Sequence, residues 1–309
     1  MTAQKRPPST ADQGGDTDNF RLEGPSIALD PRIHAFRADI ADLALAGQVF
    51  ATHYARPEPR LCALPTAMMQ SSPESTGPAI SQLLYGEQFC VLDITRGWAW
   101  GYSRHDHYVG YVREEALGAA VPAAAPVPAP YVVAARQALV FADADIKSPL
   151  AMRLPLGARI TALETGGNGM VRMEKGWVHP RHIIPAGKRV ADFVTMAERL
   201  MGTPYLWGGR ASNGIDCSGL LQLALSFAGI HAPRDSDQQR DTLGRPVKGN
   251  SLRRGDLVFF PGHVGIMADD HRLIHASGYW MQVVIEPLAE VIALFALTHD
   301  QPVQAVKRL

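Results

Sequence analysis

The sequence predicts an α+β protein in which two small β units precede a C-terminal domain that begins with helices. Short apolar runs between turn residues fill the stretch before an Ala/Pro-rich segment, which is typical of antiparallel β structure. A similar pattern returns after that segment. From about Lys188 onward, two helical patterns come before four strand patterns, an order that favours an α+β domain.

The amino-acid composition of the chain limits the classes of molecule that we expect it to bind. The chain has 309 residues, and its 30 basic and 30 acidic side chains give a formal net charge of +0. This balance gives no electrostatic reason to expect nucleic acid or an anionic membrane surface as a partner. No uninterrupted apolar run is long enough to span a bilayer. We therefore expect two or three globular domains, with no nucleic acid and no membrane as partner.

The N-terminus and the cysteines bear on location. Residues 1–29 are polar and rich in Pro, Gly and Asp, and no apolar core of a secretory signal follows the basic pair, so we expect a flexible tail. Cys62, Cys90 and Cys217 are widely spaced and odd in number, so they indicate neither a disulfide framework nor a metal-binding spacing. Together these features predict a reducing, cytoplasmic location.

The first domain is expected over residues 30–118. Its start has apolar residues at helical spacing, which predicts a helix within Asp30–Phe50 that packs against the first β unit. Four apolar runs bounded by turn residues then predict strands: Ala79–Tyr85, Phe89–Leu92, Trp98–Tyr102 and Tyr108–Val112.

Residues 119–130 alternate Ala and Pro, which predicts an extended, semi-rigid linker. Behind it, residues 131–187 repeat the earlier pattern: LPLGARITALE mirrors LLYGEQFCVLD, and KGWV mirrors VGYV. The pair resembles the bacterial SH3 (SH3b) domain, a small barrel that usually binds peptides or cell-wall material. Two small β modules that merely pack together remain the alternative.

The last domain is expected over residues 188–309. Val190–Met201 reads as an amphipathic helix that stops at a Gly-Thr-Pro sequence, and Leu220–Gly229 reads as a buried helix that ends in glycine. Strands are predicted at Asp256–Phe260, His263–Ala268, Arg272–Ala276 and Val283–Pro287.

Cys217 stands where a glycine-rich turn becomes the buried helix. Asp216 is a good N-cap, so Cys217 would be the first helical residue, where free N–H groups and the macrodipole favour a thiolate. This pattern predicts a nucleophile. A small residue that allows close packing fits the same stretch equally well.

A thiolate nucleophile needs a base, and two histidines lie in predicted strands. His263 and His275 could line up on adjacent strands, one beside the thiol and the other orienting the first ring. Each histidine alone is more simply a hydrogen-bonded core residue. A zinc site of Cys217 with both histidines is also conceivable, although no second cysteine is near.

Six motifs in order, YLWGG, NGIDCSGL, APRDSDQQ, RRGDLVFF, GHVGIM and LIHAS, resemble the NlpC/P60 family of papain-like cysteine peptidases. With two SH3b-like units in front, the chain looks most like the cytoplasmic γ-D-glutamyl-L-diamino acid endopeptidases that recycle cell-wall peptides. The resemblance implies that Cys217 is the nucleophile, His263 the general base and His275 the residue that orients it. It implies no metal and no cofactor.

The resemblance also implies a substrate, a murein stem peptide whose N-terminal L-Ala carries a free amine. Asp235 and Ser236 would bind the ammonium, although Asp235 also fits as a simple helix N-cap. The remaining predicted substrate contacts are the cleft-wall Trp207 and two residues of the first β unit, Glu87 and Tyr108, with Tyr111 as the rival of Tyr108.

Other functions stay open on the sequence alone. The runner-up is a peptidoglycan hydrolase that acts on intact cell wall with SH3b domains as anchors. A binding module with a vestigial site and an acyl or amide transferase on a related scaffold are further alternatives. The sequence determines neither the oligomeric state nor whether the diamino acid is diaminopimelate or Lys. It also leaves open whether the second β unit touches substrate.

Overall fold

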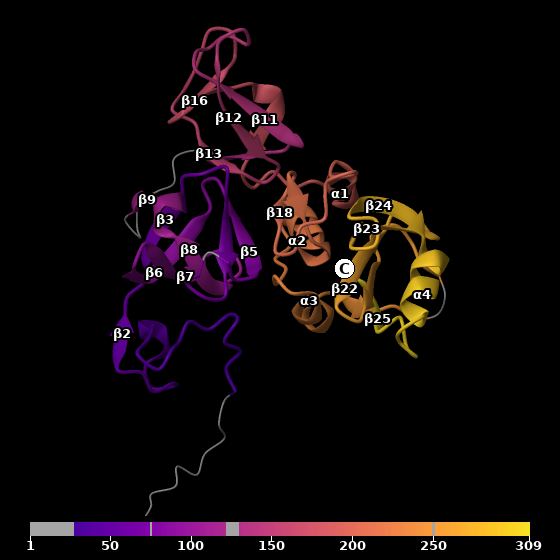
Figure 1. The fold of residues 1–309 in the computed structure, drawn as a ribbon. Helices are drawn as coiled ribbons and strands as arrows, with labels where there is room; N and C mark the ends of the chain where they lie inside the picture. Colours follow the sequence, from indigo (N-terminus) through magenta and orange to yellow (C-terminus); the bar gives the residue numbers. More distant parts are fainter. Residues whose placement is uncertain (1–27, 75, 122–129, 249–250) are drawn as a thin grey trace, which may run out of the picture.

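The computed structural model describes residues 28–74, 76–121, 130–248 and 251–309, and Figure 1 shows them as three bodies. Two β units lie next to each other, and the C-terminal body with its helices lies beside the first of them (Figure 1). The tail predicted over residues 1–29 falls outside the described residues, except for its last two positions. No helix in the described ranges is long and apolar enough to cross a membrane.

The first β unit is a seven-stranded sheet with the order β5-β4-β8-β7-β6-β3-β9. Alternating buried side chains, among them Met69, Leu83 and Phe89, fill its interior. The four predicted strands are present as β5 to β8. The bounds are β3 (Glu58–Cys62), β4 (Thr66–Gln70), β5 (Ala79–Leu84), β6 (Gln88–Thr95), β7 (Trp98–Ser103), β8 (Val109–Arg113), η2 (Glu114–Ala116) and β9 (Leu117–Ala120).

The prediction of a helix within Asp30–Phe50 is wrong. This segment instead forms β1 (Ile40–Asp42), the 3-10 turn η1 (Leu43–Leu45) and, beyond it, β2 (His53–Ala55), which pairs with β1 in parallel. The Asp42 carboxylate accepts the N–H of Ala44 and so starts η1 instead of a longer helix. The apolar side chains still pack on the outside of the first β unit, as predicted, because Ala35 and Ile40 contact the cluster that contains Trp100 and Tyr102.

The second β unit has a three-stranded sheet, β13-β10-β17, and a five-stranded sheet, β12-β11-β16-β15-β14. Gly86 and Gly157 hold equivalent places in the two predicted repeats, and both have positive φ, 75° and 90°. The bounds are β10 (Pro130–Val133), β11 (Gln137–Phe141), β12 (Leu150–Pro155), β13 (Arg159–Thr161), β14 (Glu164–Thr165), β15 (Val171–Met173), β16 (Gly176–Val178), η3 (Pro180–His182) and β17 (Ile183–Pro185).

The predicted linker, residues 119–130, lies mostly outside the described residues. At its two ends, β9 runs to Ala120 and β10 begins at Pro130. The two β units also meet directly, because the N–H of Arg159 donates to the carbonyl of Tyr85 at 2.8 Å. The side chain of Tyr85 is buried in the second unit's core.

The C-terminal body is built on a six-stranded sheet with the order β20-β25-β21-β22-β23-β24. The helix α2 packs on one face through residues such as Leu220 and Leu223, and α4 packs on the other through Val291 and Phe295. The bounds are α1 (Val194–Glu198), β18 (Arg210–Ala211), β19 (Gly214–Ile215), α2 (Cys217–Phe227), α3 (Ser236–Thr242), β20 (Arg245–Pro246), β21 (Leu257–Phe260), β22 (His263–Met267), β23 (Arg272–Ser277), β24 (Gln282–Pro287), α4 (Leu288–Ala296) and β25 (Ala305–Arg308).

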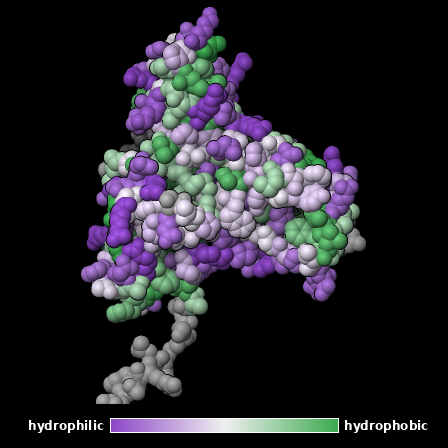
Figure 2. Space-filling model, viewed as in Figure 1, coloured by the Kyte–Doolittle hydropathy of each residue, from purple (hydrophilic) through white to green (hydrophobic). Residues whose placement is uncertain are grey.

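The four predicted strands of this body are present as β21 to β24. The first predicted helix is shorter than expected, because the Asp192 carboxylate accepts the N–H of Val194 and the helix begins only there. The α4 helix leaves Leu294 and Leu297 exposed, and Figure 2 shows apolar residues gathered over this part of the surface.

Candidate active site

Cys217 is the first residue of α2, and the residue before it, Asp216, fixes the start of the helix. Asp216 is the N-cap, and its carboxylate accepts the N–H of Gly219 at 2.7 Å. The Arg234 guanidinium, 1% exposed, pairs with the same carboxylate at 2.6 Å. The structure thus confirms the predicted cap and the place of Cys217 as the first helical residue.

The charge state of Cys217 depends on its burial as well as on the helix start. Burial raises the pKa of the thiol to about 12, and the negative charge of Asp216 adds to the rise. Hydrogen bonds from the backbone N–H groups of Val264 and Ser218 lower the pKa, but by less. Burial therefore favours the neutral thiol in the resting site and opposes the thiolate that the helix start favours, so the thiolate stays a prediction.

The two predicted histidines meet directly. His263 Nε2 lies 2.7 Å from His275 Nδ1, and the rings are edge-on, with centroids 4.9 Å apart. Burial lowers the pKa of both rings, and that of His263 to about 3, with the neighbouring His275 adding to the shift. Both imidazoles are therefore neutral at pH 7. The contact confirms the prediction that the two histidines line up on adjacent strands. Their catalytic roles remain a prediction.

His263 is the first residue of β22, and the residue after it contacts the thiol. The N–H of Val264, the following residue, donates to the sulfur of Cys217. The His263 ring also stacks on Phe295 of α4, with centroids 5.6 Å apart. Because His275 takes up Nε2, only Nδ1 of His263 remains to exchange a proton.

One cavity of about 280 Å³ contains Cys217 together with four of the five predicted substrate contacts, namely Tyr108, Trp207, Asp235 and Ser236. Trp207 stands 64% exposed, as expected for a wall of the opening. The rest of the lining is Ile80 from the first β unit and Tyr205, Asp216, Ser218, Arg234, Asp237 and Gly262 from the C-terminal body.

Asp235 occupies the N-cap position of α3, but its side chain makes no capping hydrogen bond. Its carboxylate instead accepts the Tyr108 hydroxyl, which lies 3.0 Å from each oxygen. Burial raises the pKa of Asp235, although Tyr108 and two arginines counteract the shift. Between the two tyrosines, Tyr108 is the one at this cavity, since the Tyr111 hydroxyl accepts from Arg37 and lines a different cavity.

Arg32 also contacts Asp235, and it was not among the residues predicted from the sequence. Its guanidinium lies 2.9 Å from Asp235 Oδ2 and 3.0 Å from Asp237 Oδ1, and it also binds Asp30. The backbone carbonyl of Arg32 accepts the N–H of Val109 in β8. The segment therefore joins the first β unit to α3, and no local sequence signal could have shown this.

Glu87 is the predicted contact that the structure places elsewhere. Burial would raise its pKa, but the Arg210 guanidinium 2.9 Å away holds the pKa at about 2. The same carboxylate also accepts the N–H of Leu84. Glu87 lines another cavity, with Arg210 and Gln222, and it joins the first β unit to β18 instead of facing Cys217.

Two further residues extend the histidine pair. His275 Nε2 lies 3.1 Å from Glu286 Oε1, and Trp280 Nε1 donates to Glu286 Oε2 at 2.5 Å. Neither Glu286 nor Trp280 was among the residues predicted from the sequence. A signal was present in VVIEP, where a single charged residue ends an apolar strand.

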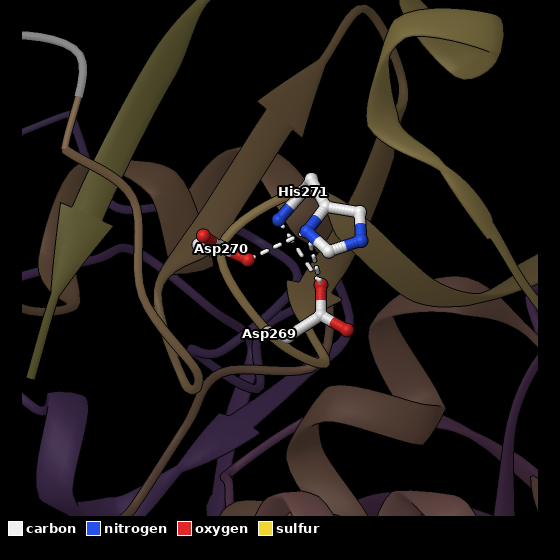
Figure 3. Close-up of side chains that lie close together, drawn as sticks. All are labelled: Asp269, Asp270 and His271. Carbon is white, nitrogen blue, oxygen red and sulfur yellow. Dashed lines mark hydrogen bonds and ion pairs between the residues drawn. The ribbon is translucent and has the colours of Figure 1, made fainter.

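The zinc alternative has no support in the geometry. Across the described ranges, the one group of His, Cys and carboxylate atoms close enough to share an ion is Asp269, Asp270 and His271 (Figure 3). This group forms the turn between β22 and β23, where the Asp269 carboxylate accepts the N–H groups of His271 and Arg272. It is a capped turn, and it is separate from the lining of the Cys217 cavity.

Comparison with known proteins identifies two segments. Residues 202–298 match the NlpC/P60 family, and residues 69–117 match the bacterial dipeptidyl-peptidase Sh3 domain. Dipeptidyl-peptidase 6 of Lysinibacillus sphaericus is 34% identical over 139 residues, which are 43% of this chain and 49% of that protein. The gamma-DL-glutamyl hydrolase of Bacillus subtilis is 40% identical over 105 residues, 30% of this chain and 25% of that protein.

A solved structure covers more of the fold. The crystal structure of an NlpC/P60 family protein from Bacillus cereus has a TM-score of 0.68 and 20% identity, and the match covers 81% of this chain and 99% of that one. At this identity the likeness concerns the fold alone. The chain spans about half the length, or less, of the curated relatives named above.

Proposed function

We propose that this chain, which carries an NlpC/P60 domain behind a bacterial SH3 domain, is a cysteine endopeptidase of cell-wall peptides. Its proposed target is the γ-D-Glu–L-diamino acid bond of murein stem peptides that have a free N-terminal L-Ala. One observation carries the proposal: a single cavity holds the Cys217 thiol and, from another part of the fold, the Asp235 carboxylate with Tyr108. The names of the relatives, a dipeptidyl-peptidase and a gamma-DL-glutamyl hydrolase, agree with it.

In the first step, the sulfur of Cys217 bonds to the substrate's carbonyl carbon while Nδ1 of His263 takes the thiol proton. The transfer accompanies the attack, because the resting thiol and imidazole are both neutral. The carbonyl oxygen gains negative charge and is stabilised by N–H groups at the start of α2, including that of Cys217.

In the second step, the imidazolium of His263 gives its proton to the leaving amine, and the C–N bond breaks. A thioester to Cys217 remains. Water then attacks the thioester while His263 accepts a proton from it, which releases the L-Ala-D-Glu dipeptide and restores the thiol. His275 holds the His263 ring throughout, and no step uses a metal or a cofactor.

The cavity end that holds Asp235 and Tyr108, here called the charged end, has a net negative charge that supports recognition of an ammonium. Asp30, Asp235 and Asp237 share one guanidinium, that of Arg32. The other arginine at the cavity, Arg234, pairs with Asp216, so negative charge is in excess. An ammonium on Asp235 would gain a charge-assisted hydrogen bond in a partly dry site. A stem still attached to glycan has no amine there, and it would meet Ile80 and Tyr108 of the first β unit.

The test is product analysis by mass spectrometry on three substrates. They are L-Ala-γ-D-Glu-diaminopimelate, its N-acetylated form, and the same stem attached to glycan. We expect only the free-amine peptide to be cut, into a dipeptide and the diamino acid. Equal cleavage of free and acetylated peptides would refute the proposed specificity. Release of stem fragments from intact sacculi would favour the wall hydrolase instead.

The proposed setting is recycling of released peptides in the cytoplasm, because cleaved stems there carry the free amine that the charged end requires. Cell fractionation with an antibody against the chain tests this part separately. Recovery of the protein outside the cytoplasm would remove the recycling role and leave the peptidase chemistry unaffected.

A further inference from the structure

Glu286 connects to the histidine pair by a diagonal contact across two strands. In the β23–β24 register, His275 lies opposite Val284, so Glu286 is two residues further along on the same face. Its side chain is only 15% exposed, and its two oxygens are divided between two partners. Oε1 faces His275 Nε2, and Oε2 accepts from Trp280 Nε1.

This contact determines where the protons of both neutral rings lie. An ionised carboxylate can only accept, so the nitrogen of His275 that faces Glu286 carries the hydrogen. A neutral imidazole has one N–H, so Nδ1 of His275 must accept from His263, whose Nε2 lies 2.7 Å away. His263 then has its only hydrogen on Nε2, and its Nδ1 is a free base.

Without the carboxylate, the opposite arrangement would satisfy the same contact between the rings. His275 would donate from Nδ1, His263 would accept at Nε2, and Nδ1 of His263 would carry a hydrogen and be unable to act as a base. We propose that Glu286 is a positioning residue that selects the tautomer of both histidines, and that Trp280 keeps the Glu286 side chain in the required orientation. The inference rests on the proposed peptidase function for its kinetic part.

Trp280 makes the proposal sharply testable, because an indole N–H only donates. Glu286→Gln keeps the shape of the side chain but has one acceptor oxygen for two donors. The short contact with Trp280 takes that oxygen and turns the amide NH₂ toward His275. An NH₂ group there imposes the unproductive tautomer. Removing the indole N–H with Trp280→Phe frees the amide to rotate and present its oxygen to His275.

We therefore expect Glu286→Gln to lower kcat by roughly 100-fold with KM nearly unchanged, the scale of lost general-base catalysis. Adding Trp280→Phe to Glu286→Gln should recover about tenfold of that loss, although Trp280→Phe alone lowers the activity. Glu290→Gln, an exposed position two residues into α4, is the matched control and should keep wild-type kinetics. Wild-type kcat in Glu286→Gln, or no recovery in the double variant, would overturn the proposal.

A second readout is independent of activity. Nitrogen NMR of the full chain with isotope-labelled histidine distinguishes Nδ1–H from Nε2–H imidazoles, and the Cys217→Ala protein gives the same information without turnover. We expect both buried rings in the Nε2–H form in the wild type, and in the Nδ1–H form in Glu286→Gln. Unchanged tautomers would overturn the inference even if the peptidase is active. Changed tautomers in an inactive protein would support it and refute only the proposed function.

Discussion

The two ends of the candidate cavity are built in opposite ways. At one end, the start of α2 places Cys217 in the cavity, and the histidine pair of β22 and β23 lies behind it, with thiol and imidazoles buried and neutral. The other end brings together Arg32, Tyr108 and Asp235 from three separate stretches, and it is charged. The comparison teaches that burial keeps the groups proposed for chemistry neutral, whereas the groups proposed to bind the substrate's amine keep their charge through ion pairs.

The largest effect is expected at the nucleophile end. Cys217→Ala removes the attacking sulfur and should lower kcat by roughly 1,000-fold or more, while the thermal midpoint of unfolding stays near that of the wild type. Peptide turnover followed by mass spectrometry measures this. Cys90→Ala, another buried thiol but in the first β unit, is the control and should keep full activity. Turnover by Cys217→Ala at the wild-type rate would show that Cys217 is not the nucleophile.

A Glu87 variant tests whether this residue belongs to the substrate site or only stabilises the fold. Glu87→Gln leaves the buried Arg210 without its ionic partner and should lower the free energy of unfolding by about 3–5 kcal/mol. The folded variant should keep its KM for the free-amine peptide, because Glu87 is outside the cavity. Urea denaturation measures the first effect, and kinetics below the unfolding transition measures the second. A large rise in KM with unchanged stability would return Glu87 to the substrate site.

Asp235 tests the charged end directly. Asp235→Asn keeps the shape but removes the charge, so KM for the free-amine peptide should rise roughly 10- to 100-fold with little change in kcat. The preference over the acetylated peptide should fall by the same factor. Asp241→Asn, an exposed aspartate on the same helix, is the matched control. If Asp235→Asn left the preference intact, the ammonium would have to bind elsewhere.

The smallest expected effect, taken per pH unit, is a dependence of the free energy of unfolding on pH. His263 and His275 have pKa values below the usual 6.5, so below pH 6.5 the unfolded chain binds more protons than the folded one. His263 should therefore contribute a loss of up to about 1.4 kcal/mol per pH unit as the pH falls below 6.5, and His275 a loss in the same direction. Denaturation curves of wild type and His263→Asn compare the slopes. Equal slopes would show that burial does not keep His263 neutral.

Much of the nucleophile end could be predicted from the sequence. The Asp216 cap, the helix behind Cys217 and the strands that carry His263 and His275 follow from local rules, since caps and strand alternation depend on neighbours a few residues away. The same kind of rule failed for the segment after Asp30. There, packing against the first β unit decided the conformation in place of helical spacing.

Only the tertiary structure decided which charged groups form ion pairs and which side chains are buried away from water. Arg32 and Asp235 are 203 positions apart, and no spacing rule connects them. Asp235 and Glu87 are both acidic residues near the cleft motifs, yet one faces the cavity and the other is neutralised by Arg210. The sequence by itself determined that a cysteine heads a helix. Whether its thiol is charged depends on burial, a property of the whole fold, and burial here raises the pKa of the thiol more than the nearby N–H groups lower it.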